Sequence, residues 1–398
     1  MKIITLVLIS AGLLSPAFLL AAPVDKPTVK ALPAPMWKTS VEGVTEYHLA
    51  NGLTVLLYPD VSKPTITTNI VYKVGSRQES YGETGMAHLL EHLLFRPSAE
   101  FGLKAGSKSP IDVLNGMGAY FNATTWYDRT NYSATFPDSA ENLDLMLRME
   151  ADRMVHAALA QNDLWNPVTK KGEMTIVRNE FEMGENDPIR VTGERMQSVA
   201  FDWHNYGKSS IGTRSDIEHV NISNLRNFYR RYYQPDNAVL MVAGRFDSDK
   251  VLAQINRIFG KIPQAKRLLA PTYTSEPAQD GERSVTVRRP GGNQYLAAGY
   301  HIPSSNHADA VPLSLLTEIL SSASDGRLSK ALIDRKLATK VEGGQNSNLE
   351  PGFLSFGAVL AKDANFEQAQ HSLLDVLENL KAQPITQEEL QRAKQSIL

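Results

Sequence analysis

The sequence predicts an α+β protein built from two related domains. Runs typical of strands alternate with runs typical of helices along most of the chain. Near the start, Asn51-Gly52 separates two strand-like runs, which is the strongest short signal for a β-hairpin. After a proline-containing stretch at 263–284, the order strand, helix, strand, helix echoes the first half. We therefore expect domains at 43–262 and 285–398, joined by a linker at 263–284.

Each element follows from its local pattern. In the first domain we expect strands at 45–49, 53–58, 65–74, 120–126, 131–136 and 238–244. The expected helices there are 85–95, 139–154, 171–183, 216–233 and 249–259, and the polar segment 101–114 is expected to be a loop. In the second domain we expect strands at 284–287, 295–301 and 352–360, and helices at 312–321, 327–333, 366–381 and after 386. No Gly or Asn closes the last helix, so this domain is expected to be incomplete.

Composition excludes several classes of function. The 398 residues are 42% hydrophobic and 21% charged, as in an ordinary globular protein. A net charge of -2 gives no argument for binding nucleic acid or an anionic membrane surface. The absence of cysteine excludes disulfides, thiolate metal sites and cysteine nucleophiles. Any zinc must therefore be bound by His, Asp or Glu.

The N-terminus predicts export. Lys2 precedes an apolar run at 3–20, and Ala21-Ala22-Pro23 follows, as in a secretory signal peptide covering 1–22. A membrane anchor is the alternative, but Gly12, Ser15 and Pro16 interrupt the run and no basic flank follows it. No other run reaches about 18 apolar residues, so no stable membrane anchor is expected after cleavage. We expect a periplasmic or secreted protein with a proline-rich leader at 23–42.

The predicted helix 85–95 carries the strongest chemical signal. His88, Glu91 and His92 interrupt an otherwise apolar run at spacing i, i+3, i+4, so they share one helical face. The order His-x-x-Glu-His is the inverse of the common zinc motif. Two ordinary histidines on a helix are the alternative, but three titratable groups in a leucine-rich helix need something to satisfy them.

The two halves differ at this motif. An alignment of 312–320 with 86–94 places Ser314, Thr317 and Glu318 at the positions of the three motif residues. The second domain would then repeat the fold without a metal site. A further acidic pattern lies in the predicted helix 171–183, where Glu173 and Glu180 share one face with two apolar residues. Its local pattern fits an exposed acidic face as well as a functional one.

The ordered series of motifs resembles the pitrilysin/insulinase family of zinc metallopeptidases, which includes mitochondrial processing peptidases and bacterial periplasmic homologues. The resemblance extends from about Tyr47 to the C-terminus. The matching motifs are Leu49-Ala50-Asn51-Gly52-Leu53, Gly85 to Phe95, Asn122-Ala123-Thr124-Thr125, Glu150 with Asp152-Arg153-Met154, Glu173-x-x-x-Val177-x-x-Glu180, His204-Asn205-Tyr206-Gly207 and Tyr233-x-Pro235-x-Asn237. The resemblance implies that each half has an antiparallel-rich sheet with helices over one face.

The resemblance also implies roles for individual residues. His88, His92 and Glu180 would bind one Zn²⁺ per chain, and Glu91 would be the general base of a peptidase acting on extended peptides. This agrees with the chemistry, since a catalytic zinc takes three protein ligands and keeps one position open. Glu173 would be the carboxylate that accepts the second ring N–H of a histidine ligand.

Substrate contacts are implied less directly. Asn122 and Ala123 fall where the family holds an extended peptide along an edge strand, and a purely structural strand is the alternative. Arg327 matches an arginine that many members place opposite the zinc, whereas Thr339 stands where they have a tyrosine. A further half of the protein, a second copy or a partner subunit would then complete the site. The remaining alternative is a non-catalytic binding or structural subunit of the same fold.

Overall fold

The computed structural model describes residues 32–398 except 272–273, 291, 293, 347 and 398. The predicted signal peptide at 1–22 and the start of the predicted leader lie outside the described residues. Among the helices of the described part, none combines the length and the apolar character needed to cross a membrane.

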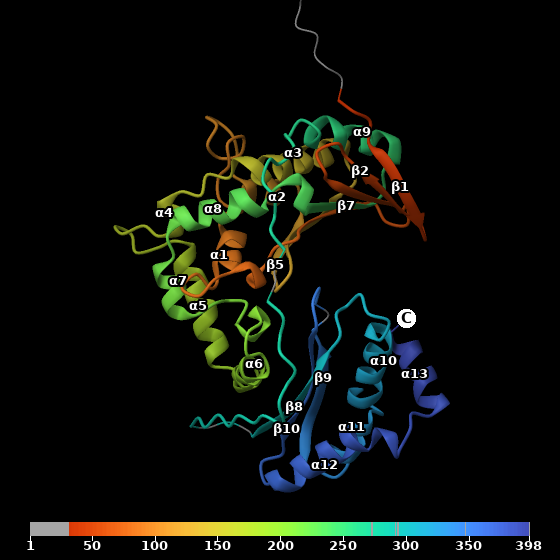
Figure 1. Cartoon of the computed structure of the whole chain (residues 1–398). Coiled ribbons are helices and arrows are strands. Elements are labelled where there is room, and N and C mark those ends of the chain that lie inside the picture. The colour runs from red at the N-terminus through yellow and green to blue at the C-terminus, as the bar shows by residue number, and fades with distance from the viewer. Residues whose placement is uncertain (1–31, 272–273, 291, 293, 347, 398) are drawn as a thin grey trace, which may run out of the picture. The chain divides into compact units, whose positions relative to one another are not determined.

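The first domain is built on a seven-stranded sheet with the order β1-β2-β3-β7-β4-β6-β5 (Figure 1). Its strands are β1 (Met36–Val41), β2 (Val44–His48), β3 (Thr54–Pro59), β4 (Thr65–Tyr72), β5 (Tyr120–Thr125), β6 (Thr130–Pro137) and β7 (Ala238–Gly244). All neighbours run antiparallel except β3 and β7, which are parallel. The two edges of the sheet are therefore β1 and β5.

Nine α-helices belong to the described part of the first domain. They are α1 (Met86–Leu93), α2 (Pro110–Gly116), α3 (Ala140–His156), α4 (Gln161–Leu164), α5 (Glu173–Glu185), α6 (Pro188–Ala200), α7 (Arg214–His219), α8 (Ile222–Tyr232) and α9 (Ser248–Phe259). Burial alternates along β4, where Ile66 and Ile70 are buried and their neighbours are half-buried. The buried face shares one hydrophobic core with Leu90 of α1, Leu147 of α3 and Ile255 of α9.

An ion pair lies inside this core. Arg153 and Glu150 of α3 are 2% and 0% exposed, and Arg153 Nε donates to Glu150 Oε2 at 2.6 Å. The guanidinium carbon lies 4.3 Å from the centre of the Tyr132 ring. Because both charges are buried, each depends on the other for its stabilisation.

The second domain is smaller. Its three strands are β8 (Tyr295–Ile302), β9 (Ala338–Gln345) and β10 (Gly352–Leu360), which form an antiparallel sheet in the order β8-β10-β9. Its helices are α10 (Ala310–Ser321), α11 (Arg327–Leu332), α12 (Phe366–Glu378) and α13 (Gln387–Ile397). A second hydrophobic core joins Leu354 and Phe356 of the sheet to Leu320, Leu328 and other apolar side chains of the helices. Both domains thus confirm the predicted α+β class.

Several elements differ from the sequence expectation. Strand β1 lies within the predicted leader, and all six of its residues are exposed, so no buried alternation marks it. Residues 284–287 form no strand, because no neighbouring strand pairs with them in the described residues. The predicted helix 216–233 is divided at Val220 into α7 and α8, where Asn221 caps the second helix. Helix α6 was not predicted, although Asp187-Pro188 is a typical helix start.

The segment predicted as a linker has no regular secondary structure in its described residues, but it is bound to the first domain. Glu276 accepts hydrogen bonds from the three consecutive backbone N–H groups of 202–204, at 2.6–3.0 Å. Arg283 forms two hydrogen bonds with the Asp202 carboxylate, at 2.9 and 2.6 Å. The segment is therefore held along the domain rather than free of it.

Candidate metal centre

Helix α1 is fixed at its N-terminus by backbone geometry and by a buried carboxylate. Gly85 precedes the helix with φ 90°, and a Cβ at this position would lie 2.5 Å from the Ile211 carbonyl oxygen. Glu79 accepts hydrogen bonds from the N–H groups of Gly85 at 2.8 Å and Ala87 at 2.7 Å. A carboxylate at this end satisfies helix N–H groups and complements the helix dipole.

Three donor atoms converge between α1 and α5. Glu180 Oε2 lies 3.5 Å from His88 Nε2 and 3.6 Å from His92 Nε2. Zinc bonds of about 2.0–2.1 Å place tetrahedral ligand atoms about 3.3–3.4 Å from one another. The spacing and the donor types therefore fit a single zinc ion. His88, Glu91 and His92 also form a group whose potential ligand atoms lie within 4.8 Å of one another.

A carboxylate orients one of the imidazoles. His92 Nδ1 lies 3.0 Å from Glu173 Oε2, so the opposite ring nitrogen faces Glu180. Glu173 is buried, and Arg96 Nε donates to its other oxygen at 2.5 Å. The arrangement is the one in which a carboxylate fixes the tautomer of a metal-binding histidine. Sequence reasoning assigned no role to Arg96, which lies four residues beyond His92, after the end of α1.

Burial and mutual interactions shift the pKa values of these side chains in different directions. Burial, together with the nearby His92, lowers the pKa of His88 to about 4. Burial alone would lower the pKa of His92, but its interactions with Glu173 and Glu180 raise it to about 9. The interaction with His92 also lowers the pKa of Glu180. Zinc binds the neutral form of imidazole, so zinc binding at His92 would release any proton held there.

Glu91 lies beside the three donors and has a different environment. It is 7% exposed, and Thr125 Oγ1 donates to its Oε2 at 2.5 Å. Burial raises the pKa of Glu91, and the hydrogen bond from Thr125 partly offsets this effect. A raised carboxyl pKa suits a group that must both accept and release a proton near neutral pH.

These side chains line a cavity of about 320 Å³ next to the edge strand β5. Its lining consists of His88, Glu91, His92, Phe95, Asn122, Ala123 and Glu180. Helix α1 contacts β5 directly, and the two lie next to one another in Figure 1. The structure therefore brings together the predicted metal-binding, general-base and substrate-binding residues of the first domain.

Arg327 is placed differently and is not part of this lining. Its Nε and Nη2 donate to the two carboxylate oxygens of Glu389, both at 2.8 Å. It also donates to the carbonyl oxygens of Gln383 and Pro384. Arg327 therefore binds α13 and the segment before it, and its substrate contact stays a prediction. Thr339 lies on β9, where its hydroxyl donates to the Val359 carbonyl.

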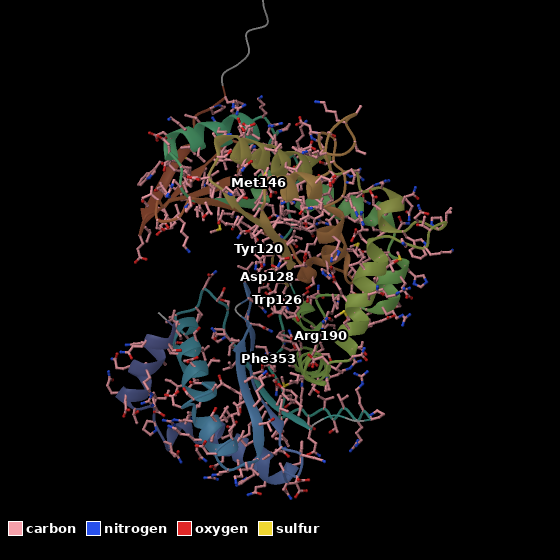
Figure 2. All side chains as sticks on the ribbon, turned by 180° about the vertical axis from the view of Figure 1, so that it is seen from behind. Tyr120, Trp126, Asp128, Met146, Arg190 and Phe353 are labelled. Atoms are coloured by element: carbon pink, nitrogen blue, oxygen red, sulfur yellow. The ribbon has the colours of Figure 1, made fainter. Side chains whose placement is uncertain are left out.

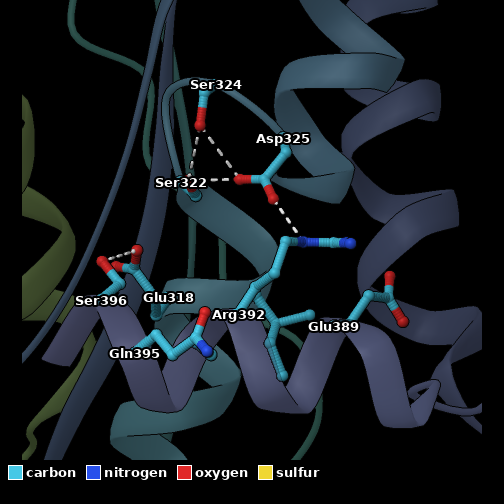
Figure 3. Close-up of a pocket in the computed structure, with 10 residues that line it drawn as sticks. Glu318, Ser322, Ser324, Asp325, Glu389, Arg392, Gln395 and Ser396 are labelled. Atoms are coloured by element: carbon cyan, nitrogen blue, oxygen red, sulfur yellow. Dashed lines mark hydrogen bonds and ion pairs between the residues drawn. The ribbon is translucent and has the colours of Figure 1, made fainter. Parts of the chain in front are cut away.

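A second cavity, of about 260 Å³, lies between α10 and α13 in the second domain (Figure 3). Arg392 pairs with Asp325 at 2.6 Å, and Ser322 also donates to this carboxylate at 2.7 Å. Its lining contains no histidine, and Asp325 already has Arg392 as a cationic partner. Within the described residues, the metal-type cluster is therefore that of the first domain.

Comparison with known proteins gives two family matches, which meet near residues 214–219. Residues 54–214 match the family described as Insulinase (Peptidase family M16), and residues 219–397 match the Peptidase M16 inactive domain. The chain is 33% identical over 352 residues to "Zinc protease PqqE" of Helicobacter pylori, covering 87% of this chain and 76% of that protein.

Solved structures show the same fold. The crystal structure of a protease from Helicobacter pylori superposes with a TM-score of 0.80 and 29% identity, covering 92% of this chain and 84% of that chain. The first half of the periplasmic protease PqqL from Escherichia coli gives a TM-score of 0.67 with 22% identity, covering 92% and 77%. With matches that extend over both domains, the chain belongs to the M16 (insulinase) family of peptidases.

Proposed function

We propose that this chain is a zinc-dependent endopeptidase or oligopeptidase that hydrolyses extended peptides. The observation that carries the proposal is the convergence of His88 Nε2, His92 Nε2 and Glu180 Oε2, with Glu180 3.5–3.6 Å from both imidazoles. Two neutral imidazoles and one carboxylate leave a divalent ion with net positive charge. The names of curated relatives as zinc proteases agree with this assignment.

His88, His92 and Glu180 would hold the zinc. When bound, zinc supplies a Lewis acid for the scissile carbonyl and lowers the pKa of a coordinated water. Glu173 would keep the His92 imidazole in the tautomer that presents Nε2, because its carboxylate accepts from Nδ1. Arg96 would in turn hold the Glu173 carboxylate in place through their hydrogen bond.

Glu91 would carry the proton. Its Oε1 would accept a proton from the attacking water and then deliver it to the nitrogen of the departing amine, so the carboxylate is regenerated in each turnover. The burial that raises the pKa of Glu91 favours this exchange, since a carboxyl group of ordinary acidity returns a proton less readily. The neighbouring Phe95 lines the same cavity and would limit access of bulk water.

The edge strand β5 would hold the substrate. Asn122 and Ala123 line the cavity from β5, which pairs with β6 on one side only. An extended peptide added to such an edge gains main-chain hydrogen bonds and tolerates varied side chains. We infer that its scissile bond would then lie over the donor cluster.

We infer a periplasmic location for the mature chain. The support is the predicted signal peptide at 1–22 together with the similarity of the fold to a protein titled a periplasmic protease.

The test is to purify the chain from about Ala22 and to measure bound metal and cleavage of a quenched fluorescent peptide library, beside Glu91→Gln. We expect about one zinc per chain in both proteins and cleavage by the wild type alone. Glu318→Gln in α10 is a matched control and should cleave like the wild type. Absence of metal from the wild-type protein, after reconstitution with zinc, would contradict the proposal.

A second candidate is a zinc-binding half that needs another copy or a partner chain for activity. Two observations favour it: the match of 219–397 to the inactive domain and the engagement of Arg327 by Glu389. In this case wild type and Glu91→Gln both hold zinc and neither cleaves. Activity that rises steeply with protein concentration, or on addition of a partner, would distinguish this candidate from the first.

A further inference from the structure

We propose that Thr125 is a positioning residue for the general base, and that its hydroxyl fixes the orientation of the Glu91 carboxylate. The inference rests on the proposed function. It concerns a residue of β5, the strand that we propose holds the substrate. It gives the contact between β5 and α1 a role in positioning the general base.

The contact itself is specific. Thr125 Oγ1 lies 2.5 Å from Glu91 Oε2, and it is the one hydrogen-bond donor to this carboxylate within the described part of the chain. The last torsion of a glutamate side chain is broad, so packing alone orients a carboxylate poorly. A single strong donor to Oε2 therefore decides which way Oε1 points, and Oε1 is the atom that would accept the proton.

Thr125 can fulfil this role because the end of β5 is itself fixed. Thr125 pairs with Thr130 of β6, whose buried hydroxyl donates to the Val74 carbonyl at 3.0 Å. The carbonyl oxygen of the next residue, Trp126, accepts from the Ser76 N–H at 3.1 Å. Figure 2 labels Trp126 at this end of the strand.

The turn at 75–79, which contains Ser76, also holds the start of α1, the helix that carries Glu91. Gly75 lies so close to β5 that a Cβ there would lie 2.0 Å from the Trp126 carbonyl oxygen. Four residues later, Glu79 accepts from the N–H groups of Gly85 and Ala87 at the start of α1. Strand end and helix are thus both tied to the turn 75–79, and the Thr125–Glu91 separation is set from both sides.

The effect of the Thr125 hydroxyl on turnover can be measured separately from any effect on the binding of metal or peptide. Loss of the hydroxyl leaves the zinc donors, the strand edge and the turn in place, so binding of metal and peptide should persist. Only the orientation of the proton acceptor should suffer. A misoriented Glu91 carboxylate slows the chemical step, so it reduces turnover rather than the affinity for metal or peptide.

The experiment compares Thr125→Val, Thr125→Ser and the control Thr135→Val in the zinc-loaded protein. Thr135 lies on β6, where its hydroxyl contacts Thr67 at 2.9 Å rather than Glu91. For Thr125→Val we expect kcat to fall roughly 10- to 100-fold, with KM within about twofold and unchanged zinc affinity. Thr125→Ser should recover most of the loss, and Thr135→Val should match the wild type.

A readout without turnover accompanies the kinetics. In crystals of the metal-free proteins, the Glu91 carboxylate should have one orientation in the wild type and Thr125→Ser, and more than one in Thr125→Val. Wild-type kcat in Thr125→Val, a serine variant as slow as the valine variant, or one shared orientation in all three proteins would each overturn the inference. A wild type that binds no zinc would refute the proposed function instead, and the crystal comparison would still decide the positioning role.

Discussion

Helices α1 and α10 carry polar residues at positions that the alignment of 312–320 with 86–94 makes equivalent, and the two helices use them in opposite ways. In α1, His88 and His92 extend to Glu180 of another helix. In α10, Ser314 and Thr317 donate to backbone carbonyls of their own helix, at 3.1 and 2.8 Å. Short hydroxyl side chains bond back to the preceding turn, whereas imidazoles are long enough to reach a neighbouring element.

The neighbours of the two helices differ as well. Helix α1 packs against α5, which supplies both Glu173 and Glu180. Helix α10 packs against α13, and Glu318 there accepts a hydrogen bond from Ser396 at 2.8 Å. The comparison teaches that the candidate metal site depends on the histidines of α1 together with the carboxylates that α5 brings to them.

The largest expected effect is on the free energy of unfolding, when the ion pair of the first domain is removed and compared with that of the second. Arg153→Met should lower the free energy of unfolding by about 3–5 kcal/mol, because it leaves Glu150 buried without a partner. Arg327→Met removes a pair whose side chains are each 16% exposed, and should cost only about 1 kcal/mol. Urea denaturation of both metal-free variants gives the two values. Equal losses would show that burial does not separate the two pairs.

Transplanting the motif tests the comparison most directly. The triple variant Ser314→His, Thr317→Glu, Glu318→His places His-x-x-Glu-His on α10, without a counterpart of Glu180. We expect any new site to bind zinc at least about 100-fold more weakly than the first domain does. Competition with a chromogenic chelator measures this, with Glu180→Gln in the same chain to remove the original site. Tight zinc binding by the transplanted chain that also carries Glu180→Gln would show that the motif alone suffices.

A smaller effect is expected at Glu173, which contacts His92 on the ring nitrogen that faces away from Glu180. Glu173→Gln should weaken zinc binding about 10- to 100-fold, since His92 loses the carboxylate that sets its tautomer. Glu185→Gln, at the end of the same helix, is the matched control and should bind zinc like the wild type. Zinc titration against a competing chelator is the measurement, and equal affinities for the two variants would contradict the assigned role of Glu173.

The smallest effect concerns acid stability in the second domain. The hydrogen bonds from Arg327 lower the pKa of Glu389 from an ordinary value of 4.5 to about 2. A lowered folded-state pKa contributes stability above the ordinary value, and this contribution is lost as the pH falls toward 2. Wild type should therefore exceed Glu389→Gln by about 1 kcal/mol at pH 7 and by nothing near pH 2. A difference that does not change with pH would rule out this origin.

Local sequence patterns correctly predicted those elements in which buried and exposed residues follow a regular order along the chain. The apolar run of α1 and the alternation in β4 are of this kind, and both were found where expected. Strand β1 was missed because its exposed residues carry no alternation, and 284–287 was wrongly predicted as a strand because pairing depends on a partner that the sequence does not reveal.

The candidate site shows the same division. The motif on α1 could be recognised from spacing, whereas Glu173 and Glu180 fitted an exposed acidic face equally well until α5 was seen against α1. Thr125 belonged to a matching motif but was given no role, because its contact with Glu91 joins a strand to a helix residue that lies 34 positions earlier in the chain. Arg327 was expected near the zinc, and only the structure shows Glu389 holding it in the second domain.

The edge of β5 that faces away from β6 affects the tendency of the protein to aggregate. Tyr120 to Thr125 carry no charged side chain, and lysines or other charges are what usually discourage strands of different molecules from pairing. An edge that binds peptide substrates, as we propose for β5, is equally accessible to any extended chain at high concentration, including an unfolded copy of this protein. We expect the readiness to aggregate to be concentrated at this strand, so that a short peptide bound there should act as a stabiliser in storage.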